Sequence, residues 1–317
     1  MRYGLGFIGR RLCGALLTLA LVSLAVFAAF TRIPGDSAMA LRGIEASGEQ
    51  LAALQEELGL RRSFWEQYRS WLGKLLSGRL GNSIGFQGAS ISALILDRLP
   101  VTLCLAGLSL VCVLLIAGAL IPLAIQKEGS PADRIINTLT AFPISLPAFF
   151  LGILFIWVFG ILFKCFTPGA YVGYQEDFSA FLAYLSFPAL AVALPNAAIL
   201  IKFLRASIFK EFSAGYVRTA YSKGNSRFRA FYRHVLKNAA VPGITLLGMI
   251  AAELFSGSMV IEQVFAIPGI GRLLIAGVAA RDYPLVETLA VYIAAAVILA
   301  NALADMLIGL IDPRIRR

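Results

Sequence analysis

Apolar residues fill six long stretches of the chain, and most charged residues lie between them. Each stretch is long enough to cross the roughly 30 Å hydrocarbon layer of a bilayer, which takes about 20 residues of α-helix. This pattern predicts an all-α membrane protein with about six transmembrane helices. The predicted spans are Leu12 to Thr31, Leu99 to Gln126, Ile135 to Phe163, Ser179 to Ile201, Ala239 to Ile261 and Glu287 to Ile311.

Composition supports this interpretation. Of the 317 residues, 59% are hydrophobic and only 15% are charged, and the mean hydropathy is +0.79. These values are too apolar for a soluble globular protein. The net charge of +10 could indicate nucleic acid, but the basic residues flank the predicted spans. We therefore expect contact with membrane lipid and no nucleic-acid partner.

The placement of basic residues predicts the topology. Arg2, Arg10 and Arg11 precede the first span, and residues 202–238, between the fourth and fifth spans, carry nine lysine and arginine residues against a single acid, Glu211. The positive-inside rule assigns both segments to the cytoplasm, and six crossings return the C-terminus there. The first span exceeds the 7–15 apolar residues usual in a cleaved signal peptide, so we expect it to be retained.

The spans divide the chain into four parts. Residues 1–31 form a tail and the first span, and residues 32–98 form an external loop with surface helices. Residues 99–311 form a five-helix core that includes the basic connection, and residues 312–317 form a cytoplasmic tail. Within the loop, Ser47 to Gln50 has the form of a capping box that begins a helix. Phe64 to Leu72 is rich in aromatic residues, which favours an anchor at the lipid headgroups.

Patterns typical of soluble enzymes occur in the wrong context. Gly81-x-Ser83-x-Gly85 has the letters of a nucleophile elbow, but we expect it outside the membrane, whereas the single histidine, His234, lies in the cytoplasmic connection. No phosphate-binding loop is present, and one histidine provides no metal-ligand set. We predict no catalytic, cofactor or metal site, so this chain is not expected to be an enzyme.

The basic connection contains the most informative motif. Tyr216, Ala220 and Gly224 are spaced four apart, so on a helix they would share one face, with Arg218 and Lys223 beside it. Small residues let a partner approach closely. Charge alone would equally favour a helix lying on anionic lipid.

The stretch Tyr216 to Gly224, followed by Arg233-His234, resembles the EAA loop of binding-protein-dependent ABC importers. Its form is similar to that of the dipeptide/oligopeptide and nickel permease family. The general Glu-Ala-Ala is here Arg218-Thr219-Ala220, a departure that favours the peptide branch. Similar blocks occur in order along the chain: residues 10–36, 78–83, 98–103, 262–271, 281–284 and 312–316.

This resemblance implies a type I ABC importer permease fold in a bacterial plasma (inner) membrane. It also implies a second homologous permease, two cytoplasmic ABC ATPases and an external or periplasmic substrate-binding protein. The long first external loop is typical of the first permease subunit. By the resemblance, the residues that couple to the ATPases are Tyr216, Arg218, Ala220, Lys223 and Gly224. Peptides are the expected cargo, and nickel or metal chelates remain an alternative.

Two acidic residues inside predicted spans support a different class of protein. Glu253 and Asp305 could relay protons in an ion-coupled secondary transporter, because acids within a membrane often mark ion pathways. Glu253 is expected to face a translocation pathway or a partner helix rather than lipid, with Gly257 and Ser258 as small neighbours. The sequence leaves a pathway role and a packing role open.

Thiol labelling tests the predicted topology. Cysteines introduced at Glu49 and Glu176 should react with impermeant reagents applied from outside, whereas one at Arg227 should react only from the cytoplasmic side. The measurement is made in intact cells with the four native cysteines replaced. Labelling of the Arg227 variant from outside would contradict the orientation.

Overall fold

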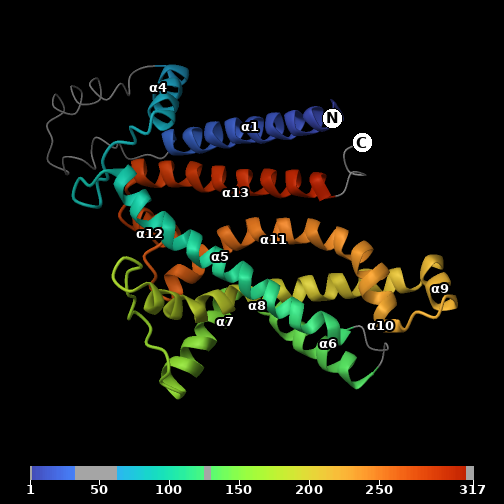
Figure 1. Ribbon diagram of the computed structural model, residues 1–317. Coiled ribbons are helices and arrows are strands. Elements are labelled where there is room, and N and C mark those ends of the chain that lie inside the picture. Colours follow the sequence, from blue (N-terminus) through green and yellow to red (C-terminus); the bar gives the residue numbers. More distant parts are fainter. Residues whose placement is uncertain (1, 33–62, 125–129, 312–317) are drawn as a thin grey trace, which may run out of the picture. The chain divides into compact units, whose positions relative to one another are not determined.

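The computed structural model describes residues 2–32, 63–124 and 130–311, and this part of the chain is helical, with one isolated β-bridge and no β-strand (Figure 1). The surface helix predicted near Ser47 lies outside the described residues. Five of the described helical segments are long and apolar enough to cross a bilayer. They lie in α1 (Arg2–Thr31), α5 (Ile91–Ala124), α8 (Phe178–Phe212), α11 (Leu236–Val264) with the short helices before it, and α13 (Tyr283–Ile311).

The third predicted span is two helices rather than one. Helix α6 (Pro131–Ile144) and helix α7 (Ala148–Phe155), which continues as the π-helical η1 (Ile156–Leu162), meet at an angle of 99°. Proline explains the break, because Pro147 has no N–H to donate and disfavours helical geometry at the residue before it. Counted as one span, the bent pair brings the total to six.

The described Cα positions cluster into two compact units, and residues 101–267 make up most of the first. Helix α8 lies at its centre and packs against α6, α7 and α11. Its buried face is rich in alanine, including Ala189, Ala193 and Ala197, which are all fully buried. Small residues let neighbouring helices approach closely, and packing of this kind drives helix association in a bilayer.

In the second unit, residues 13–100 with 268–298, helix α4 (Phe64–Leu76) packs on the second half of α1. The ring of Phe27 lies 5.3 to 5.5 Å from the rings of Phe64, Tyr68 and Trp71. The Tyr68 hydroxyl also shares a 2.9 Å hydrogen bond with Ser23. Three rings of the predicted anchor segment thus pack on α1, while Trp65 is 59% exposed. The anchor at the headgroups stays a prediction.

Asp282 closes the same unit by joining two loops. Its buried carboxylate accepts hydrogen bonds from the Ser83 hydroxyl and from the Gly85 N–H at 3.0 Å. A Cβ at Gly85 would lie 2.8 Å from Cβ of Ala280, so only glycine fits this approach. The Gly-x-Ser-x-Gly letters thus belong to a loop contact next to α12 (Ile270–Ala279).

Candidate functional site

The basic connection after α8 folds into short helices. Helix α9 (Gly215–Ser222) follows the end of α8, and α10 (Arg227–Ala230) and the π-helical η2 (Phe231–Val235) lead without interruption into α11 (Figure 1). The Ser226 hydroxyl begins α10 by accepting the Arg229 N–H at 3.3 Å.

A small apolar cluster fixes α9 to the two long helices. Val217 is the residue of α9 that belongs to this cluster. Phe212 packs against the cluster, and the guanidinium carbon of Arg227 lies 5.1 Å from the centre of the Phe212 ring. Because the cluster draws on α8, α9, η2 and α11, α9 is packed against both long helices. Its buried members are Ile208, Val217, Phe231, Val235 and Ala239.

The residues of the sequence motif differ in exposure. Tyr216 is 38% exposed, and its hydroxyl donates to the Glu211 carboxylate. Partial desolvation, and then this carboxylate, raise the pKa of Tyr216 above its usual value. Arg218 and Lys223 are exposed, whereas Ala220 is 6% exposed and faces the protein.

Gly224 lies beyond the end of α9, in the left-handed region at φ +79°. Its N–H donates to the Tyr221 carbonyl at 2.9 Å, and the Asn225 N–H donates to the Ala220 carbonyl at 3.2 Å. These bonds satisfy carbonyl groups that a helix end leaves open. The expectation that Tyr216, Ala220 and Gly224 share one helical face is therefore wrong for Gly224, which lies beyond the end of the helix, and Ala220 is buried.

Helix α11 carries an exposed stripe that includes Glu253. Met249 and Val260 are 62% and 51% exposed, and Glu253 and Ser256 are exposed between them at helical spacing. Gly257, four residues after Glu253, has open space where a Cβ would be. A carboxylate on this stripe costs about 2.5 kcal/mol or more if it faces lipid.

Ser258 does not lie on this stripe. It is 0% exposed, and its hydroxyl donates to the Phe255 carbonyl of the same helix at 2.8 Å. Closeness in the sequence predicted that Ser258 would neighbour Glu253. Five residues correspond to about 500° of helical rotation, so their side chains leave α11 in different directions.

Asp305 has a basic partner. One of its carboxylate oxygens lies 2.7 Å from the Arg11 guanidinium, which joins the beginning of α1 to the last turns of α13. Arg11 was expected only to set the topology and Asp305 was considered as a proton relay. The structure therefore gives Asp305 a contact that ties the two helices together, which the sequence did not predict.

Two buried polar contacts join residues that are distant in the sequence, and the sequence predicts neither of them. The Thr102 hydroxyl donates to the Glu262 carboxylate at 2.6 Å, with both residues 0% exposed. Asp133 and Arg205 form a second contact, an ion pair between α6 and α8. No sequence spacing relates such residues, and the only available signal was a charge within or next to an apolar stretch.

Comparison with known proteins decides the family. Residues 115–317 match the family described as binding-protein-dependent transport system inner membrane component, and residues 4–106 match the N-terminal family of the same membrane components. The chain belongs to this family of inner-membrane permeases. Membership and the apolar helices make the permease a multi-pass protein of the bacterial inner membrane.

Relatives align with the permease over nearly its whole length. It is 33% identical to a probable peptide ABC transporter permease of Sinorhizobium fredii, over 98% of this chain and 99% of the relative. It is 35% identical to a putative peptide permease of Brucella ovis, over 97% of each chain. An oligopeptide transport system permease of Bacillus subtilis is 30% identical over 93% of this chain and 94% of its own length.

Substitutions at Gly224 test how α9 ends. A β-branched residue held in the left-handed region costs roughly 1–2 kcal/mol, whereas asparagine tolerates it. We expect the Asn225 amide of Gly224→Val to exchange with deuterium about tenfold faster than that of the parent, and Gly224→Asn to behave as the parent. Equal exchange in all three chains would show that glycine is not required at this helix end.

Proposed function

We propose that this permease is the first membrane subunit of a peptide importer. Its expected partners are a second homologous permease, two cytoplasmic ABC ATPases and an external or periplasmic substrate-binding protein. The observation that carries the proposal is near full-length similarity to proteins named peptide and oligopeptide permeases. The second homologous subunit would supply the other half of the translocation pathway.

Topology follows from charge and from one contact. The Arg11–Asp305 ion pair supports placing the start of α1 and the end of α13 on the same side of the membrane, since a charged pair at 2.7 Å cannot bridge a bilayer. An even number of crossings agrees with this placement, which supports counting the bent pair α6 and α7 as one full span. The basic connection favours the cytoplasm as that side.

Helix α9 is the element best suited to contact an ATPase. Tyr216, Arg218 and Lys223 are exposed around it, while Val217 and Ala220 are buried beneath it. An acidic rim on a partner would complement the exposed basic residues. In this proposal Ala220 and Gly224 set the position and length of α9, and the other three residues make the contact.

The stripe on α11 is the proposed lining of the translocation pathway. Glu253 and Ser256 give it polar groups, and Gly257 leaves room beside the helix. An exposed carboxylate at this depth needs water or a partner, which a pathway between two permeases would supply. Ser258 is omitted from this lining because it is buried in the core.

The sequence left two alternatives to a peptide importer, and each differs from it in a property that can be measured. A nickel or metal-chelate importer would share all the features above and differ in cargo. An ion-coupled secondary transporter would need a proton relay, and Asp305, one of its two candidate acids, is paired with Arg11. Relatives named as peptide permeases favour peptides over both.

Reconstitution of the full importer tests the function. The permease is assembled with its partner permease, ATPases and binding protein, and ATP hydrolysis is measured with peptides, with nickel chelates and with no ligand. Hydrolysis stimulated by peptides and accompanied by peptide uptake is the expected result. Stimulation by nickel chelates alone would establish the alternative cargo, and ion-driven uptake without ATPases would contradict the proposal.

Substitution of Glu253 tests the pathway. Glu253→Gln removes the charge and keeps the shape of the side chain. A pathway role predicts that this variant assembles normally but has altered uptake. The change should be about tenfold if one charged contact of roughly 1.4 kcal/mol is lost. A packing role predicts normal uptake for Glu253→Gln and poor assembly for Glu253→Leu. Met249→Leu, on the same stripe, is the matched control and should behave as the parent. Parental behaviour of both Glu253 variants would exclude both roles.

A further inference from the structure

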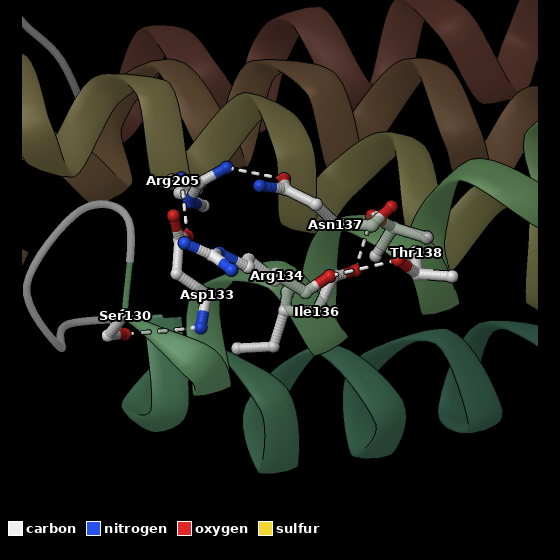
Figure 2. Close-up of polar contacts among 8 residues, drawn as sticks. Ser130, Asp133, Arg134, Ile136, Asn137, Thr138 and Arg205 are labelled. Atoms are coloured by element: carbon white, nitrogen blue, oxygen red, sulfur yellow. Dashed lines mark hydrogen bonds and ion pairs between the residues drawn. The ribbon is translucent and has the colours of Figure 1, made fainter.

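Asp133 of α6 and Arg205 of α8 form a buried ion pair, shown in Figure 2. The two charged groups are 2.5 Å apart, and their side chains are only 7% and 16% exposed. Arg205 donates a further hydrogen bond to the side chain of Asn137, one helical turn after Asp133, at 2.6 Å. Two charges are stable in such a site only while they remain together.

The surroundings hold each charge in place. Asp133 lies in the first turn of α6, where the Ser130 hydroxyl accepts its N–H at 3.2 Å (Figure 2). A carboxylate at this position is favoured by the positive end of the helix dipole. On α8, the guanidinium carbon of Arg205 lies 5.1 Å from the centre of the Phe209 ring. The pair therefore joins two ordered helix surfaces.

Along α8, the ion pair lies close to the apolar cluster that holds α9. Ile208 follows Arg205 by three residues, close to one helical turn, and belongs to the apolar cluster that holds Val217 of α9. Within about one turn of α8, Ile208 thus contacts the cluster that holds α9, and Arg205 forms the ion pair with α6. Helix α6 is the first arm of the bent span, so the pair lies between α9 and that span.

We propose that the Asp133–Arg205 ion pair is a positioning contact that makes the bent span α6–α7 move with α8 when the ATPases displace α9. The proposal rests on the coupling role proposed above for α9. Apolar helix surfaces can slide past one another, whereas separating this pair would leave two buried charges without partners. The pair therefore resists relative movement of α6 and α8.

A distance measurement tests joint movement directly. Spin labels are placed at Leu139 on α6 and Lys202 on α8, both exposed, in the complex with its ATPases and with the native cysteines replaced. The distance between the labels should be the same without nucleotide and with ATP trapped. In the double variant Asp133→Leu, Arg205→Met it should change or broaden on ATP binding. A distance that changes in the parent complex, or stays constant in the variant, would overturn the proposal.

Transport efficiency supplies the functional readout. Replacing both charges by apolar residues leaves no unpaired charge, so the double variant should assemble. We expect the number of peptides imported per ATP hydrolysed to fall about tenfold, within the usual range of coupling between sites. Arg134→Gln removes an exposed charge from the same turn and should keep the parental ratio.

The outcomes separate this proposal from the proposed function. Failure of the parent complex to bind ATPases or import peptides would refute the proposed function, whereas the label distances judge the ion pair without any cargo. Failure of the double variant to assemble would show that the pair serves stability alone and would overturn the inference. An equal loss of efficiency in Arg134→Gln would do the same, because total charge would then be responsible.

Discussion

Lipid offers no hydrogen-bond partner to the backbone, so every peptide group within the bilayer must be satisfied by the protein. The described part of this permease meets the constraint with helices, and its irregular points are closed by specific bonds. At the bend between α6 and α7, the Ser145 and Leu146 N–H groups donate to the carbonyls of Phe142 and Pro143. Beyond α11, the Phe265 carbonyl accepts the Tyr184 hydroxyl at 2.6 Å.

The same constraint explains the buried polar side chains. Thr102 and Glu262 satisfy each other between α5 and α11, and Asp133 and Arg205 do so between α6 and α8. Apolar contact contributes little specificity between helices in lipid, because the lipid tails are as apolar as the side chains. Polar pairs of this kind therefore define which faces of the helices meet and in which register.

Helix α8 connects the features with proposed roles. Its alanine-rich face packs against α6, α7 and α11, and its last turns support α9 through Ile208. Glu253 lies on α11, a neighbour of the same helix. In the proposed mechanism, a displacement of α9 would reach the bent span and the proposed pathway lining through α8, without a separate linkage for each.

Local sequence was sufficient for the number of apolar stretches, the basic connection and the family, because hydropathy, charge and the motif from Tyr216 to Gly224 are read within short segments. The bend in the third stretch had a local signal in Pro143 and Pro147, although the length of the stretch suggested one span. Tertiary structure alone placed Ala220 and Ser258 in the protein interior and paired Asp305 with Arg11. It also joined Asp133 to Arg205, because the partner of a charge and the buried side of a helix depend on segments that are distant in the sequence and adjacent only after folding.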